Sequence, residues 1–68
     1  MNKFKENLKR ERIAQGMTQR QLADMLMITQ ASYSRYEIGL REPDLDDMLI
    51  KIADVLDISL DVLTGRIG

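Results

Sequence analysis

Residues 18–37 read Thr18-Gln-Arg-Gln-Leu-Ala-Asp-Met-Leu-Met-Ile-Thr-Gln-Ala-Ser-Tyr-Ser-Arg-Tyr-Glu37. This stretch has the pattern of two short helices joined by a turn of about three or four residues. Thr18 stands three residues before Gln21, the capping-box spacing in which a hydroxyl and a side-chain amide each satisfy a backbone donor. The inner face of the first helix is predicted from apolar residues at helical spacing, Leu22, Ala23 and Leu26.

The second helix of the pair is predicted over about 30–37, after a turn formed by Met27-Ile28-Thr29, with Thr29 as its N-cap. Positions three and four apart on a helix are neighbours, so this helix has two distinct faces. Tyr33, Tyr36 and Glu37 share one face, where we expect the two tyrosines to pack in the core rather than to stack on a ligand. The other face is polar and carries Gln30, Ala31, Ser34 and Arg35.

A helix is also predicted before this pair, over residues 2–15. Asn2 is its expected N-cap and Gly16 its expected stop, because glycine adopts the left-handed conformation without a Cβ penalty. Its sparse apolar stripe consists of Phe4, Leu8 and Ile13.

Two further helices are predicted after residues 38–43, a segment that Gly39 and Pro43 mark as a loop. Asp44 is the expected cap of the fourth helix, with Asp46 and Asp47 in its first turn. Its inner face would consist of Leu45, Leu49, Ile52, Ala53 and Leu56. Ser59 is expected to open a short fifth helix that carries Leu60 and Leu63 and ends at Gly65. Five helices without strand-like alternation predict an all-α bundle, with residues 1–68 as a single domain.

The composition excludes several kinds of site. The 68 residues include no Cys and no His, so thiolate chemistry, disulfides and the commonest metal ligand and general base are missing. Asp44-Leu-Asp-Asp47 resembles the start of a calcium loop, but Leu49 and Val55 occupy the positions that require Gly and Glu. The sequence has no signal-peptide pattern and no membrane-spanning run, so we expect a cytoplasmic protein. Because the residues for these sites are missing, we also expect that it is not an enzyme and uses no metal or cofactor.

The charges are unevenly distributed along the chain. The net charge is −1, yet residues 1–41 hold eight basic and four acidic residues, and residues 42–68 hold two basic and seven acidic ones. The first part therefore carries +4 and the second −5. A local positive field rather than the net charge attracts a polyanion, although such charges are also found on ordinary solvated helix faces.

The polar face of the second helix of the pair suits contact with DNA bases. Gln pairs well with adenine and Arg with guanine, which fits Gln30 and Arg35, while Ala31 and Ser34 are small enough to lie against the groove. Gln19 lies at a helix N-terminus, where exposed N–H groups favour phosphate. The other candidates for backbone contacts are Ser32, Arg41, and Lys9 or Arg10. The alternative is that Gln30 and Arg35 are only good helix formers on a solvated face.

The chain resembles the phage-repressor-like helix-turn-helix proteins, the lambda repressor and Cro group also called XRE, over residues 4–64. The matching residues are Leu8, Arg12, Gly16-Met17-Thr18-Gln19, Leu22-Ala23, Ile28-Thr29, Ser34-Arg35-Tyr36-Glu37, Gly39, Arg41-Glu42-Pro43, Ile52-Ala53, Leu56 and Ile58-Ser59-Leu60. The resemblance implies base contacts by Gln30, Ala31, Ser34 and Arg35, and phosphate contacts by Gln19, Ser32 and Arg41. It also implies an ion pair between Arg12 and Glu37.

The sequence departs from the family pattern at a few positions. Met27 and Asp57 stand where Gly is usual, and a non-glycine residue held at positive φ costs about 1 kcal/mol. Glu11 stands where Leu is common. Ile38 and Leu40 replace the usual Asn and Lys around Gly39, which removes one expected phosphate contact.

These observations predict a sequence-specific, double-stranded DNA-binding transcriptional regulator of the repressor type, with the helix over 30–37 in the major groove. One such module reads few base pairs, so we expect a homodimer on a two-fold operator. Candidate dimer contacts are the apolar residues off the core stripe, Val55, Val62, Ile67 and Leu40. The alternative is a helix-turn-helix scaffold for protein interaction, such as an antitoxin-like or anti-repressor module, which the isoelectric point near 5.2 favours. No small-molecule ligand is indicated, and the chain could be a fragment of a longer regulator.

Overall fold

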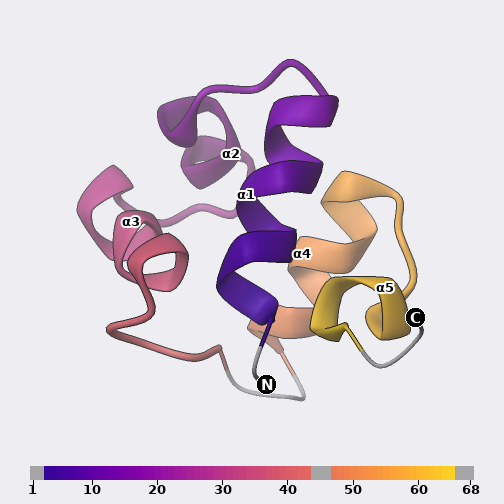
Figure 1. The fold of residues 1–68 in the computed structure, drawn as a ribbon. Helices are drawn as coiled ribbons and strands as arrows, with labels where there is room; N and C mark the ends of the chain where they lie inside the picture. Colours follow the sequence, from indigo (N-terminus) through magenta and orange to yellow (C-terminus); the bar gives the residue numbers. More distant parts are fainter. Residues whose placement is uncertain (1–2, 44–46, 66–68) are drawn as a thin grey trace.

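Five α-helices form the part of the chain that the computed structural model describes, residues 3–43 and 47–65 (Figure 1). They are α1 (Phe4–Ala14), α2 (Gln19–Met25), α3 (Gln30–Ile38), α4 (Met48–Leu56) and α5 (Leu60–Thr64). These described residues contain no strand, so the all-α class predicted from the sequence is confirmed. None of these helices is long and apolar enough to cross a bilayer.

Three of the helices begin at a hydroxyl cap that the sequence predicts. Thr18, Thr29 and Ser59 each have extended backbone and accept a hydrogen bond from the N–H three residues later, at the starts of α2, α3 and α5. At α2 the reciprocal bond is also made, since the Thr18 N–H donates to Gln21 Oε1 at 2.8 Å. The capping box and the two other caps are therefore confirmed, and they fix where the two helices of the 18–37 pair start.

Other predicted boundaries are wrong or lie outside the described residues. Asn2 is one of the latter, and Lys3 occupies the N-cap of α1 without a side-chain hydrogen bond. Ile38 is the last residue of α3 rather than part of a loop, because the left-handed turn comes only at Gly39, with φ +83°.

The fourth helix starts later than predicted, at Met48. Its N-cap is Asp47, which was expected within the first turn and makes no side-chain cap bond. Asp44 and Asp46, the expected cap and its companion, lie outside the described residues, as does Leu45. Hydrophobic period alone does not fix the first residue of a helix, because helix boundaries vary by one or two residues for the same apolar spacing.

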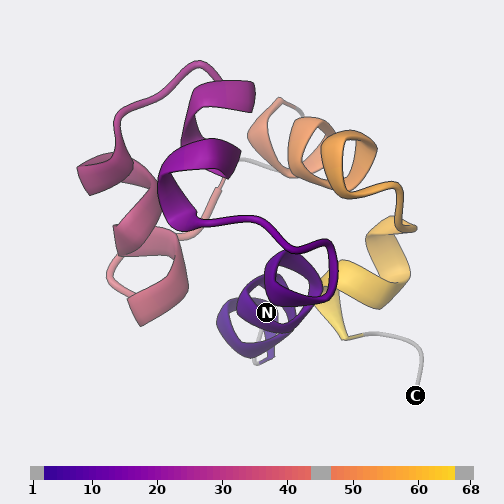
Figure 2. The ribbon, with the colours of Figure 1, turned by 90° about the horizontal axis from the view of Figure 1, so that it is seen from above.

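The core lies between α1 and the two helix pairs. In Figures 1 and 2, α2 and α3 lie together on one side of the molecule and α4 and α5 on the other, with α1 contacting both α3 and α5. The buried apolar residues come from all five helices and α2's C-cap: Phe4, Leu8, Leu22, Ala23, Leu26, Tyr33, Tyr36, Leu49, Ile52, Ala53, Leu56 and Leu63. The predicted inner faces of α2, α3 and α4 are confirmed at the described residues, and both tyrosines pack inward.

The buried stripe of α1 differs from the predicted one. Ile13 is 57% exposed, whereas Asn7 is buried. Residues 4, 7 and 8 recur at helical neighbour spacing and face the core together, while Ile13 is offset from Leu8 by well over a quarter turn. The Asn7 amide donates to the carbonyls of Val62 and Leu63 at 3.2 and 3.3 Å, so its burial is satisfied and it joins α1 to α5.

The candidate dimer contacts differ in how exposed their side chains are. Val55 and Val62 are half-buried, and Val55 packs against the core. Leu40 is 76% exposed, and Ile67 lies outside the described residues.

Both residues that replace an expected glycine have a left-handed backbone, Met27 with φ 61° and Asp57 with φ 55°. We expect Met27→Gly to raise the free energy of unfolding by about 0.5–1 kcal/mol, because the Cβ penalty disappears. The methionine side chain is 83% exposed, so little packing is lost. Urea unfolding measures the change. Met25→Gly, at a residue of α2 whose side chain is 51% exposed, is the matched control and should instead cost about 1 kcal/mol. A loss of stability in both variants would contradict the strain at Met27.

Candidate nucleic-acid interface

The polar face of α3 points away from the core. Gln30, Ala31 and Arg35 are exposed and Ser34 is half-buried. The opposite face carries Tyr33, Tyr36 and Glu37, all of them buried. The residues predicted to contact bases therefore share one accessible edge of one helix. Their contact with DNA bases stays a prediction.

A buried carboxylate fixes α3 from behind. Glu37 Oε2 accepts hydrogen bonds from Arg12 Nε at 2.6 Å and from the Tyr33 hydroxyl. Glu37 Oε1 accepts from Arg12 Nη2 at 3.2 Å and from Gln19 Nε2 at 3.1 Å. Arg12 Nη1 also donates to the Met17 carbonyl at 2.8 Å. The Arg12–Glu37 ion pair expected from the family resemblance is thus present, and its network ties α1 and the start of α2 to the buried face of α3.

The hydrogen bonds of this network shift the pKa values of its members. Burial by itself raises the pKa of Glu37, but the hydrogen bonds from Arg12, Tyr33 and Gln19 outweigh it, and the pKa lies below its ordinary value. The hydrogen bond to Glu37 raises the pKa of Arg12. Burial, followed by the bond to Glu37, raises the pKa of Tyr33. The network therefore holds a carboxylate, a guanidinium and a neutral phenol at neutral pH.

This protonation predicts a loss of stability in acid. A carboxylate with a lowered folded-state pKa contributes stability above its unfolded value and loses it as the pH falls through the folded value. The free energy of unfolding should therefore decline below the ordinary Glu pKa of 4.5. Glu37→Gln has no charge to titrate and should show a shallower decline over that range. Urea unfolding at several pH values tests this, and parallel pH profiles for the two proteins would contradict it.

Two of the predicted phosphate-contacting side chains are half-buried and hydrogen-bond within the protein. The half-buried Gln19 directs its amide to Glu37. The half-buried Ser32 places its Oγ 3.0 Å from the Thr29 hydroxyl, beside the cap of α3. Sequence reasoning missed the inward bond of Gln19, since nothing in its local pattern links α2 to α3. Removing Gln19 would disturb Glu37 as well as any phosphate contact.

The other predicted phosphate-contacting residues are exposed. Arg10 lies 3.4 Å from Glu11 in a surface ion pair, and Lys9 is exposed on the same helix. The Arg41 guanidinium lies 5.8 Å from the centroid of the Tyr36 ring, a cation–π distance. Because Tyr36 is buried in α3, this contact holds Arg41 next to that helix.

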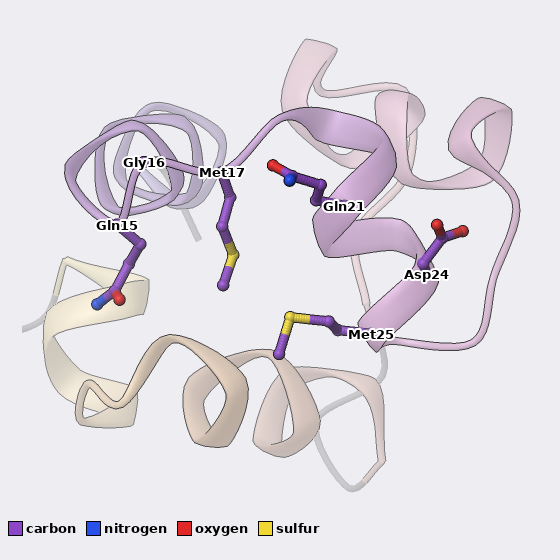
Figure 3. Close-up of a pocket in the computed structure, with 6 residues that line it drawn as sticks. All are labelled: Gln15, Gly16, Met17, Gln21, Asp24 and Met25. Carbon is purple, nitrogen blue, oxygen red and sulfur yellow. The ribbon is translucent and has the colours of Figure 1, made fainter.

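A separate pocket lies beside the turn between α1 and α2 and involves no residue of α3. It is lined by Gln15, Gly16, Met17, Gln21, Asp24 and Met25. In Figure 3 the two methionine side chains point toward α4. Asp24 is its one ionisable lining residue, and the described residues contain no group of three or more His, Cys, Asp and Glu placed to hold a metal.

Comparison with known proteins identifies the family. A helix-turn-helix family model matches residues 8–63. The chain belongs to the helix-turn-helix family. It is 50% identical over 60 residues to YqaE of Bacillus subtilis, an uncharacterised HTH-type transcriptional regulator. It is 47% identical over 64 residues to RstR of Vibrio cholerae, a cryptic phage CTXphi transcriptional repressor. The resemblance to phage-repressor-like helix-turn-helix proteins is confirmed.

Structure comparison gives the same assignment. A transcriptional regulator from Listeria innocua superposes with a TM-score of 0.83 and 31% identity, over 96% of this chain and 60% of that one. The match to YqaE includes 88% of this helix-turn-helix chain but 51% of YqaE. The match to RstR includes 94% of this chain but 56% of RstR. It therefore spans about half the length of the curated relatives it matches.

Proposed function

We propose that this helix-turn-helix chain is a sequence-specific, double-stranded DNA-binding transcriptional regulator of the repressor type, with α3 in the major groove. One observation carries the proposal: a polar, accessible edge of α3 is backed by a buried ion-pair network that fixes the helix. The relatives' names, a phage repressor among them, support it. An α-helix fits the width of the major groove of B-DNA.

The proposed contacts divide into two classes. Gln30 and Arg35 read base edges, with Ala31 and Ser34 lying flat against the groove and Ala31 able to meet a thymine methyl. The phosphate-contacting residues set the register without reading sequence. They are Gln19, Ser32, Arg41, Lys9 and Arg10. Because the side-chain amide of Gln19 is bonded to Glu37, the contact proposed for Gln19 uses its backbone N–H at the start of α2.

We further propose a homodimer on a two-fold operator. One module of this size contacts few base pairs, and dimers of such modules place half-sites about 34–36 Å apart.

The proposal is tested by binding measurements on duplex DNA. Affinity for random duplex should fall steeply with salt, because each phosphate contact adds about −0.9 to the slope of log K against log salt. Selection from a random duplex library should return a two-fold site. No measurable affinity for any duplex at low salt would overturn the proposal.

A second function, a scaffold for protein interaction, is favoured by two exposed apolar side chains at the C-terminal end of α3. Ile38 is 57% and Leu40 76% exposed, and the chain after residue 41 is acidic. A basic protein partner would then take the place of DNA. The same salt titration separates the two functions, since a protein-interaction scaffold predicts no binding to duplex DNA.

A further inference from the structure

The side chain of Lys5 lies across the end of the recognition helix. Gly39 ends α3 with φ +83°, and a Cβ placed on it would lie 3.0 Å from Lys5 Cδ and 3.4 Å from Lys5 Nζ. The ammonium group of α1 is therefore within a few ångströms of the C-terminal end of α3. The bare backbone of Gly39 is what makes room for it.

The hydrogen-bond donors of the Lys5 ammonium group are not used within the described residues. Among residues 3–43 and 47–65, Lys5 makes no ion pair and no side-chain hydrogen bond. It lies close to the C-terminal end of α3, which is the negative end of the helix dipole. A lysine ammonium has three donors, and those that point away from the helix are open to an external acceptor.

The end of α3 lies between two cations, Arg35 in its last turn and Arg41 after Gly39. Between Arg35 and Arg41 the two large exposed side chains are apolar, Ile38 and Leu40. A phosphate that approaches between these two arginines would meet apolar side chains and the negative end of the helix dipole, where a further cation would favour it.

The edge of α1 that faces α3 supplies a further cation there. Residues 5, 9 and 12 recur at neighbour spacing on α1 and so lie along one edge. At one end of this edge Arg12 bonds Glu37 of α3, and at the other Lys5 lies over Gly39. Both ends of the edge therefore contact the C-terminal half of α3.

We propose that Lys5 donates to a DNA backbone phosphate at the C-terminal end of α3 and thereby holds that end of the helix in the groove. The contact reads no sequence. This inference rests on the proposed function, because it requires α3 to lie against duplex DNA.

The test is the salt dependence of duplex binding by Lys5→Gln. Losing one phosphate contact should make the slope of log K against log salt shallower by about 0.9. If the variant binds like wild type at 1 M salt, this slope corresponds to a roughly eightfold lower affinity at 0.1 M salt. The loss should be the same on selected and random duplex. Lys5→Arg should retain the wild-type slope. Lys51→Gln, which removes an exposed lysine from α4, is the matched control for net charge and should leave the slope nearly unchanged.

Thermal unfolding without DNA separates this role from a structural one. A lysine that only neutralises the helix dipole would, when replaced, lower the melting temperature and leave the slope at its wild-type value, and this result would overturn the inference. A slope change equal to that of Lys51→Gln would also overturn it. In both cases wild-type binding persists and the proposed function stands. Absence of wild-type binding would instead overturn the proposed function and this inference with it.

Discussion

Arg12→Ala is expected to lower the free energy of unfolding by about 3–5 kcal/mol, the cost of leaving a buried charge without its partner. The Glu37 side chain is 3% exposed and that of Arg12 11%, so water does not replace the lost guanidinium readily. Two hydrogen bonds to Glu37 would vanish together with the bond to the Met17 carbonyl. Tyr33 and Gln19 would still donate to the carboxylate, which keeps the expected loss toward the lower end of that range.

The matched control is Arg10→Ala, on the same helix. Arg10 is 62% exposed and pairs with Glu11 at 3.4 Å, so its loss should change the free energy of unfolding by no more than about 1 kcal/mol. Urea unfolding at pH 7 compares the two. Equal effects would show that the burial of Glu37 is not what makes its ion pair important.

A second comparison identifies the unpaired charge as the cause. In Arg12→Ala the carboxylate loses its counter-ion, so its pKa should rise and the defect should shrink as the pH falls toward the ordinary Glu value of 4.5. Adding Glu37→Gln to Arg12→Ala should recover part of the lost stability at pH 7, because no charge is then buried alone. If Arg12→Ala loses the same free energy of unfolding at pH 7 and near pH 4.5, the lost packing of the arginine stem explains the loss instead.

The sequence predicts those features of the fold that short-range chemistry determines. The caps at Thr18, Thr29 and Ser59 depend on a hydroxyl reaching a backbone N–H three residues away, and all three are present. Met27 and Asp57 stand where the family pattern has Gly, and both residues adopt positive φ, so the turns keep the left-handed backbone in spite of the substitutions.

Long-range partners are the part that local pattern does not reveal. Asn7 bonds carbonyls 55 and 56 residues away, and Gln19 bonds a carboxylate 18 residues away. A polar residue inside an apolar stripe indicates burial, so the spacing of Phe4, Asn7 and Leu8 was the available signal for the first of these. For Gln19 no such signal exists, since its direction depends on how α2 packs against α3. The outward edge of α3 could be predicted from helical period because burial of Tyr33 and Tyr36 determines the opposite face.

Arg35→Ala is expected to weaken binding to the selected operator by about 1–3 kcal/mol, roughly 5- to 150-fold, and to relax the preference at one base position. Arg35 is exposed and takes no part in the Glu37 network, so its removal should leave folding unchanged. Binding curves on the operator, on single-base variants and on random duplex measure the effect.

Lys9→Ala is the matched control for Arg35→Ala, because each removes one exposed positive charge from a helix of the proposed interface. A phosphate contact carries no sequence information, so Lys9→Ala should weaken the operator and random duplex by the same factor. Arg35→Ala should weaken the operator more than random duplex, since only the operator presents the base it reads. Equal losses on both duplexes for Arg35→Ala would place Arg35 among the backbone contacts and leave Gln30 to carry the base reading.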